Sequence, residues 1–180
     1  QPKEAARLAA LAVRLQPNDE RLWSVLAEAQ LRSEQIDEAA ESLARAKSLN
    51  PNNAGLWFAE ASLALRANRP DDAIRLLDRG LSLDPKNATA YFDLGNARVM
   101  QSDQKRALKA FERATAIKPS YWEALNNQSL VLFEMGNTKE AIRRWRSVLK
   151  INANPEPMLA LASALNKVNP GDQESLKLAQ

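Results

Sequence analysis

The chain repeats one short phrase four times, as Leu-Gln-Pro at 15–17, Leu-Asn-Pro at 49–51, Leu-Asp-Pro at 83–85 and Ile-Lys-Pro at 117–119. The prolines that close these phrases are evenly spaced along the chain. A constant period of this length is typical of helical repeat arrays, in which each repeat packs against its neighbours and not around one shared core. The sequence therefore predicts a stack of similar units. Such stacks usually present binding surfaces and seldom catalyse reactions.

Further columns of residues keep the same spacing. The first holds large, mostly aromatic side chains: Trp23, Trp57, Tyr91 and Leu125. A small column, Ala39, Ala73, Ala107 and Ala141, is followed by a large apolar one, Leu43, Leu77, Phe111 and Trp145. Another small column then precedes the proline: Ala46, Gly80 and Ala114, with Val148 in the fourth repeat. Alternating small and large side chains let two helices approach closely and fill the gaps beside the contact.

These columns resemble the tetratricopeptide repeat (TPR) family, whose pattern is an aromatic residue, Leu-Gly, Ala, Phe, Ala and Pro over about 34 residues. The stretch 88–121 matches the pattern best, with Tyr91, Leu94, Gly95, Ala107, Phe111, Ala114 and Pro119. The resemblance covers nearly the whole chain. It implies an all-α, right-handed superhelical solenoid of antiparallel helix hairpins.

Each repeat is predicted to hold two helices. In 20–32 the apolar residues fall on one helical face, and a second helix is expected over 36–49 after a short polar break. Asp19, Asn53 and Asn87 are placed to cap the first helix of three repeats. The predicted repeats are 20–53, 54–87, 88–121 and 122–155, all in one continuous array.

Partial repeats are expected at both ends. Residues 1–19 should contribute a second helix over 3–15, and residues 156–180 a degenerate repeat with a first helix over 156–168 and the start of a second at 172–180. We expect the chain to be a piece of a longer array or of a longer protein, because the apolar residues of 3–15 do not resemble a polar terminal cap.

Composition excludes several kinds of active site. The chain has no cysteine and no histidine, so disulfides, thiolate metal sites and the commonest general base are all excluded. Its five glycines are scattered and form no phosphate-binding loop. The acidic pair Asp71 and Asp72 follows Pro70 at a helix start, where carboxylates offset the helix dipole. We therefore expect no enzyme activity, no catalytic residue, no metal and no cofactor.

The charge balance is only weakly basic. A formal net charge of +3 is too small to indicate nucleic-acid binding, which needs many phosphate contacts. No apolar run is long enough to suggest a membrane-spanning helix. We expect a cytoplasmic location, with the soluble part of a membrane-associated protein as the alternative.

The resemblance implies that partners lie along an inner groove lined by the first helix of each repeat. By register, the groove residues are expected to be Phe58, Ser62, Leu65, Arg66, Phe92, Asn96, Met100, Asn126, Leu130 and Phe133. Val99 and Glu134 fall on the same faces. The large apolar members would anchor a peptide or helix, and the asparagines could bond its backbone. The alternative is that these side chains only pack helix against helix.

Two charged features accompany the groove. Lys139, Arg143, Arg146 and Lys150 share one face of the predicted helix after Gly136. They form either a solvated outer face or a basic surface for an acidic partner or anionic lipid. Glu60 and Arg98 occupy positions that the repeat pattern makes apolar, so we expect them to pair with each other.

The sequence thus predicts a protein–protein interaction scaffold or adaptor that binds a partner peptide or helix in its groove. Two alternatives stay open. One is self-assembly into a homo-oligomer through the ends of the array. The other is the recruiting arm of a larger enzyme or of a membrane-associated complex, with any catalytic part outside this chain.

Overall fold

The computed structural model describes residues 2–151 and 155–169, and within these ranges every regular element is an α-helix. The helices fall in two compact units, residues 1–86 and 87–180. Unit 1 contains α1 (Pro2–Leu15), α2 (Glu20–Arg32), α3 (Ile36–Leu49), α4 (Ala54–Arg66) and α5 (Pro70–Leu83). Unit 2 contains α6 (Ala88–Met100), α7 (Gln104–Ile117), α8 (Trp122–Glu134), α9 (Thr138–Ile151) and α10 (Pro155–Val168).

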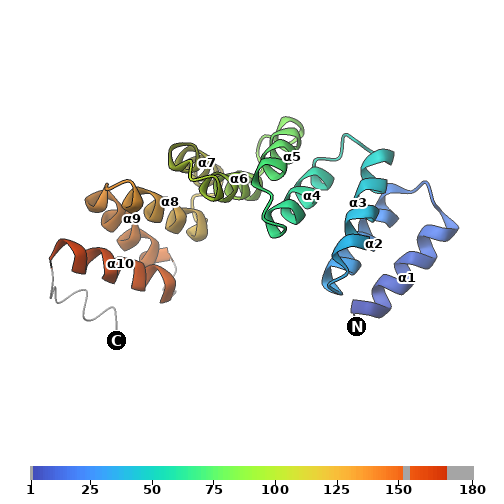
Figure 1. Cartoon of the computed structure of the whole chain (residues 1–180), viewed down its shortest axis with the longest axis horizontal. Helices are drawn as coiled ribbons and strands as arrows, with labels where there is room; N and C mark the ends of the chain where they lie inside the picture. The colour runs from blue at the N-terminus through green and yellow to red at the C-terminus, as the bar shows by residue number, and fades with distance from the viewer. Residues whose placement is uncertain (1, 152–154, 170–180) are drawn as a thin grey trace. The chain divides into compact units, whose positions relative to one another are not determined.

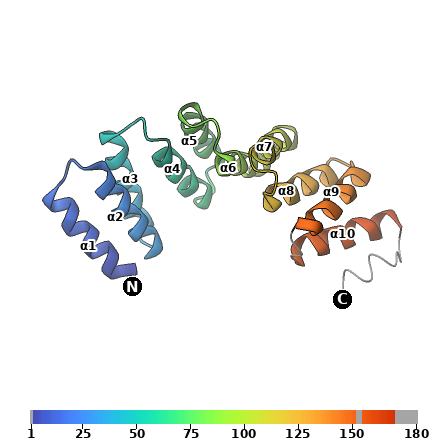
Figure 2. The same cartoon turned by 180° about the vertical axis from the view of Figure 1, so that it is seen from behind.

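Consecutive helices within each unit pack against each other (Figures 1 and 2). The predicted all-α class is confirmed, and α2 and α3 have the bounds expected for the two helices of a repeat. The helices expected over 3–15 and 156–168 are present as α1 and α10. The helix expected from residue 172 lies outside the described residues.

The helix starts follow from the predicted caps. The side-chain oxygens of Asp19, Asn53 and Asn87 accept hydrogen bonds from backbone N–H groups in the first turns of α2, α4 and α6. Each bond satisfies a donor that the helix itself leaves without a partner. Successive caps are one repeat apart in the sequence. The first helix of each of these repeats therefore begins at the same repeat position.

The turn inside each hairpin repeats just as regularly. Glu34, Asn68, Ser102 and Gly136 occupy the same position in successive repeats, and all have a positive φ, between 55° and 84°. Only Gly136 is a glycine, the residue that reaches this region without steric cost. The other three are held there by the flanking helices, because the residue that follows each turn donates its backbone N–H to the end of the preceding helix.

In unit 1, residues of the aromatic column donate hydrogen bonds to residues of the proline column. Trp23 Nε1 donates to the carbonyl oxygen of Pro17, and Trp57 Nε1 donates to that of Pro51, both at 2.8 Å. Each bond spans the turn that links one hairpin to the next. It gives the indole N–H a partner while the rest of the ring stays half-buried between helices.

Two glycines make room for phenylalanine rings. A Cβ atom built at Gly95 in α6 would lie 2.3 Å from Cε1 of Phe111 in α7. In the preceding hairpin the roles of the two helices are exchanged, since a Cβ at Gly80 in α5 would lie 2.3 Å from Cε1 of Phe58 in α4. The large side chain thus comes from the second helix in one hairpin and from the first helix in the other.

The same two repeat positions meet between successive hairpins, but the residues at these positions are apolar in one repeat and polar or charged in another. In unit 1, Val13 and Leu26 share an apolar cluster, whereas the equivalent pair one repeat later is Lys47 and Glu60, which form an ion pair. In unit 2 the same positions hold Thr115 and Gln128, and Gln128 Nε2 donates to Thr115 Oγ1 at 2.9 Å. Polar and apolar contacts therefore both occur at this position of the stack.

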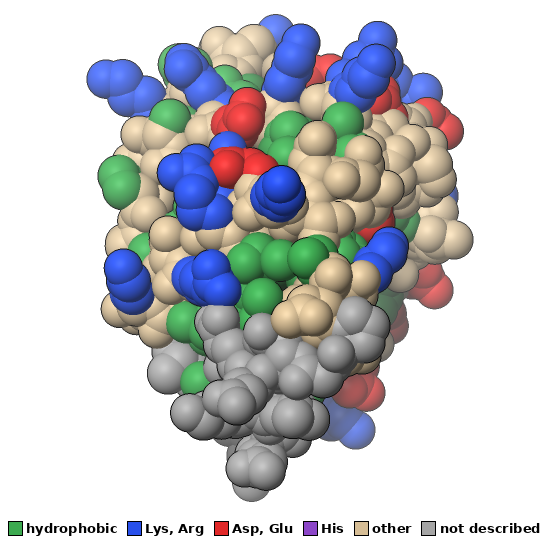
Figure 3. All heavy atoms as spheres, turned by 90° about the vertical axis from the view of Figure 1, so that its left-hand side faces the viewer, with side chains coloured by type: hydrophobic (Ala, Val, Ile, Leu, Met, Phe, Trp, Pro, Cys, Tyr) green, Lys and Arg blue, Asp and Glu red, His purple; other side chains and the backbone are tan. Residues whose placement is uncertain are grey.

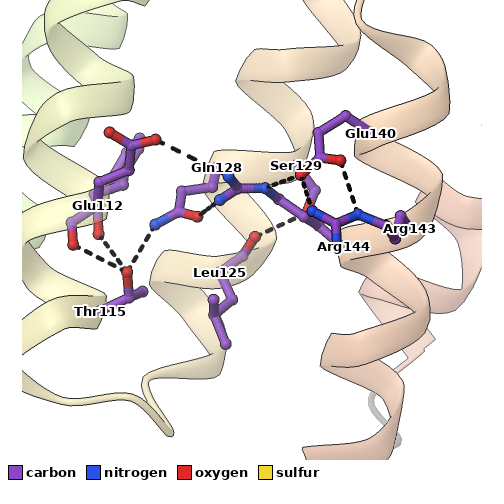
Figure 4. A network of polar contacts seen from close by, with 9 residues as sticks. Glu112, Thr115, Leu125, Gln128, Ser129, Glu140, Arg143 and Arg144 are labelled. Carbon is purple, nitrogen blue, oxygen red and sulfur yellow. Dashed lines mark hydrogen bonds and ion pairs between the residues drawn. The ribbon is translucent and has the colours of Figure 1, made fainter.

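Gln128 belongs to a larger polar network that joins three helices (Figure 4). Its side chain is buried, and its Oε1 accepts a hydrogen bond from Arg144 Nη1. Arg144 Nε also donates to Glu140 at 2.9 Å, and its Nη2 lies 4.0 Å from Glu112. The network connects α7, α8 and α9 and gives partners to the polar groups of Gln128, which would otherwise be costly to bury.

The close approach of Gly95 and Phe111 leads to a prediction for stability. Gly95→Ala should destabilise the chain by roughly 1–3 kcal/mol, because the new methyl group overlaps the Phe111 ring. Phe111→Ala should cost about 3–5 kcal/mol, because that ring is fully buried. In the Phe111→Ala background, Gly95→Ala should cost nothing or stabilise, since alanine is the better helix former. Urea unfolding of the four proteins, followed by circular dichroism, measures this coupling; additive effects would contradict the packing described.

Candidate functional site

The candidate site is a cavity between the first helices of two successive hairpins in unit 2. It has a volume of ≈ 300 Å³ and is lined by residues of α6 and α8 alone. The lining residues are Asn96, Val99, Met100, Asn127, Leu130, Val131 and Glu134. Apolar side chains form most of this surface, which is typical of sites that bind an apolar group of a ligand.

Two amides converge at this cavity. Asn127 Nδ2 donates to Asn96 Oδ1 at 3.0 Å, so each side chain fixes the orientation of the other. The bond leaves the amino group of Asn96 and the carbonyl oxygen of Asn127 available. One donor and one acceptor held side by side can bond the C=O and N–H of a peptide backbone.

An acidic side chain completes the lining. Glu134, the last residue of α8, is exposed and has no ion-pair partner among the described residues. Its negative charge is at the C-terminal end of a helix, where the helix dipole favours a cation. The cavity therefore combines an apolar surface, an amide pair and a site that would attract a positive charge.

The sequence predicts much of this lining. Asn96, Met100 and Leu130 are among the expected groove residues, and all three line the cavity, together with Val99 and Glu134 on the same helix faces. Val131 is not among the expected residues. It lies four residues after Asn127 on α8, so the helical spacing of the polar residue could have indicated it.

Asn126 corrects the prediction. Instead of offering its amide to a partner, it is 1 % exposed and does not line the cavity. Its Oδ1 accepts a hydrogen bond from Trp145 Nε1 at 2.9 Å, and its Nδ2 donates to Glu156 at 3.1 Å. The buried Trp145 indole needs an acceptor, and Asn126 supplies it.

The three predicted phenylalanines are half-buried and pack on their own units. Phe58 lies against Gly80, and the Phe92 ring lies 5.8 Å from that of Phe111. The centroid of Phe133 is also 5.8 Å from the Trp145 ring. None of the three lines the cavity. The alternative in which these side chains pack helix against helix accounts for these contacts.

The groove residues predicted in unit 1 lie on α4. Ser62 and Arg66 are exposed and Leu65 is half-buried. None of them lines the cavity between α1 and α2, which has a volume of about 400 Å³. The two charged residues that line that cavity, Glu28 and Arg32, form an ion pair with each other at 2.6 Å. It therefore offers fewer available polar groups than the cavity of unit 2.

The predicted basic residues of α9 are all exposed. Arg143 pairs with Glu140 at 2.7 Å, so its charge is partly offset. Two arginines lower the pKa of Glu140 to about 2, Arg143 first and then Arg144 through hydrogen bonds. Figure 3 shows one face of the molecule, on which separate Lys and Arg side chains (blue) are scattered among tan, green and red atoms.

Glu60 belongs to unit 1 and Arg98 to unit 2, so their expected pairing stays a prediction, but each side chain has a contact inside its own unit. Glu60 forms an ion pair with Lys47, and Lys47 Nζ also lies 4.6 Å from the centroid of the Trp57 ring. Arg98 Nη1 donates to Gln101 at 3.1 Å. Each charged group therefore has a polar partner within its own unit.

Two family models for the tetratricopeptide repeat match this chain, one over residues 20–53 and the other over residues 58–122. The chain belongs to the tetratricopeptide repeat family. Among curated protein sequences, none gives a significant match.

Solved structures of other TPR proteins share the fold. A crystal structure of MamA has 23 % sequence identity and a TM-score of 0.79, and the match covers 89 % of this chain and 87 % of that one. MamA from Desulfovibrio magneticus RS-1, from residue 41 to its end, has 18 % identity and a TM-score of 0.79 over 84 % and 86 % of the two chains. YrrB, described as a TPR protein with an unusual peptide-binding site, has 16 % identity and a TM-score of 0.79 over 97 % and 90 %.

Neither a membrane span nor a metal site is found in the described parts of this TPR chain. No helix there is both long and apolar enough to cross a bilayer. The same residues contain no group of three or more acidic side chains placed to hold a metal ion.

One carboxyl group in the middle of α6 is unusual. Burial raises the pKa of Asp93 from its ordinary value of 3.8 to about 6. The pKa of Tyr121 is also raised, first by burial and further by the negative charge of Asp93. Asp93 therefore destabilises the folded chain when it is ionised.

This shift predicts a pH-dependent effect of Asp93→Asn. Between about pH 4 and 6 the folded chain binds a proton at Asp93 that the unfolded chain has released, so the stability of the parent falls as pH rises through this window. The variant lacks that loss and should be more stable at pH 7, by about 1–3 kcal/mol. Urea unfolding of both proteins from about pH 4 to about pH 7 tests the sign. Equal stabilities at about pH 7, or a difference that grows towards pH 4, would contradict it.

Proposed function

We propose that this TPR chain is a protein-interaction scaffold that binds an extended segment of a partner protein in the cavity between α6 and α8. The observation that carries the proposal is the combination of an apolar lining with a fixed pair of amides and the unpaired Glu134. Exposed apolar surface with a few convergent polar groups favours ligand binding over mere packing.

The lining also indicates the chemistry of the partner. An apolar side chain such as Leu or Met would contact Val99, Met100 and Leu130. The backbone beside it would bond the amides of Asn96 and Asn127, whatever its side chains are. A Lys or Arg nearby would then face Glu134. The expected ligand is a segment in which an apolar residue lies near a basic one.

Selection of peptides from a random display library tests this proposal. The selected sequences should share an apolar residue with a basic residue close to it. Met100→Asp should abolish their binding, because it places a charge in the apolar lining. Glu134→Lys should weaken binding about tenfold to a hundredfold, since each change of about 1.4 kcal/mol alters affinity by a factor of 10. Fluorescence anisotropy gives the dissociation constants.

Glu41→Lys is the matched control, because Glu41 is an exposed acid on α3, outside the cavity. It should leave binding unchanged, and circular dichroism should show that all variants keep their helices. Selected peptides without a basic residue, or equal binding by the Glu134→Lys and Glu41→Lys variants, would remove Glu134 from the site. Binding that survives Met100→Asp would refute the cavity as the site.

A second candidate function is association between copies of the chain, favoured by one apolar face. Leu8, Leu11 and Leu15 lie on the same side of α1 and are 54 %, 45 % and 83 % exposed. Exposed leucines at this spacing are typical of a helix that packs against another helix. Leu8→Glu with Leu15→Glu should then lower the mass measured by light scattering at high concentration. A parent chain that stays monomeric at high concentration would exclude this role.

A further inference from the structure

Basic side chains are concentrated on the second helices of the two hairpins in unit 2. Together α7 and α9 contain nine Lys and Arg residues but only two acidic residues, Glu112 and Glu140. The corresponding helices of unit 1, α3 and α5, contain four basic and six acidic residues. The small net charge of the whole chain hides this asymmetry.

Some of these basic residues lie in the first turn of their helix, where a negative charge is favoured. The second residue is Asp37 in α3 and Asp71 in α5, but Lys105 in α7 and Lys139 in α9. A carboxylate in the first turn interacts favourably with the helix dipole, and an ammonium group does not. The two lysines therefore act against local helix stability. A residue that breaks a local rule without a structural gain indicates a functional requirement.

The lysines on these helices have no ion-pair partner. Lys105, Lys109, Lys139 and Lys150 are exposed, and none of them pairs with an acid in the part of the chain that is described. The arginines beside them are engaged: Arg106 pairs with Asp103, Arg143 pairs with Glu140, and Arg113 lies over the Tyr91 ring. The available positive charge on this surface is therefore mainly the charge of lysine ammonium groups.

Both helices contribute to one surface. Arg144 of α9 lies 4.0 Å from Glu112 of α7, which places the two helices near each other (Figure 4). Lys105 and Lys139 occupy the same repeat position, as do Lys109 and Arg143, so these side chains project in equivalent directions from their hairpins. The charges are spread over two helices and do not follow a single line.

We propose that this α7–α9 basic surface, made of Lys105, Lys109, Lys139, Arg143, Arg146 and Lys150, docks on an anionic lipid surface. A broad set of lysine charges fits a plane of anionic headgroups, which attract each basic residue near the membrane. The aromatic residues of these two helices, Phe111 and Trp145, are fully buried, so the surface offers no ring on which nucleic-acid bases could stack. Binding would be peripheral and electrostatic. The proposal does not depend on the α6–α8 cavity.

The test is co-sedimentation with vesicles of phosphatidylcholine alone and vesicles that also contain about 30 % phosphatidylserine. The parent chain should bind only the anionic vesicles, and binding should be lost when NaCl is raised from about 0.1 M to about 0.5 M, since salt screens exposed charges. Lys105→Asp with Lys139→Asp should weaken binding by about thirtyfold or more. The same variant should melt at an equal or higher temperature, because it restores the acids found in α3 and α5.

The matched control is Lys3→Glu with Arg45→Glu, which changes the net charge by the same amount with exposed residues of unit 1. It should keep anionic-vesicle binding within about twofold of the parent, since its charges lie outside the docking surface. No binding to anionic vesicles by the parent, equal loss in the two variants, or binding that survives high salt would each overturn the proposal. Tighter binding to polyglutamate or to single-stranded DNA than to the vesicles would also overturn it.

Discussion

The hydrogen bond from a tryptophan indole to a proline carbonyl is the interaction on which the stacking of unit 1 depends. Trp23 and Trp57 each reach back across a turn to Pro17 and Pro51 at the same distance. The bond ties the first helix of one hairpin to the end of the previous hairpin. In unit 1 it therefore links the aromatic column directly to the proline column. The equivalent junction in unit 2 lacks this bond, because Leu125 replaces the aromatic residue and cannot donate a hydrogen bond. There the hydrogen bonds of Gln128 and Arg144 connect α8 to the neighbouring helices.

The repeat period of the sequence predicts the fold because the residues that recur with it, such as the helix caps, act through local contacts. The caps at Asp19, Asn53 and Asn87 depend only on neighbouring backbone groups, so their positions could be predicted from residue type and spacing. The site was harder to predict. The register places Asn96, Met100 and Leu130 on helix faces that line the cavity, but it cannot show that Asn126 is engaged by the indole of Trp145. That contact joins two different helices and depends on how the fourth hairpin packs.

The same limit applies to Phe58 and Phe92. Their repeat position faces the groove in a regular hairpin, where the second helix supplies the large core side chain. Here Gly80 leaves a space that the Phe58 ring occupies, and Phe92 packs against Phe111 and Tyr121. Packing of this kind depends on the sizes of several side chains at once. A single column of the repeat cannot reveal it.

The alternation of polar and apolar pairs between successive hairpins has a consequence for folding. Repeats of similar shape can dock in the wrong order, and misassembly is a characteristic failure of repeat proteins. A hairpin displaced by one repeat in unit 1 would bring Glu60 against Val13 and Leu26 against Lys47. Either mismatch would leave a charge facing an apolar side chain without its partner. The pairs Lys47–Glu60 and Thr115–Gln128 thus mark the order in which otherwise similar hairpins can assemble.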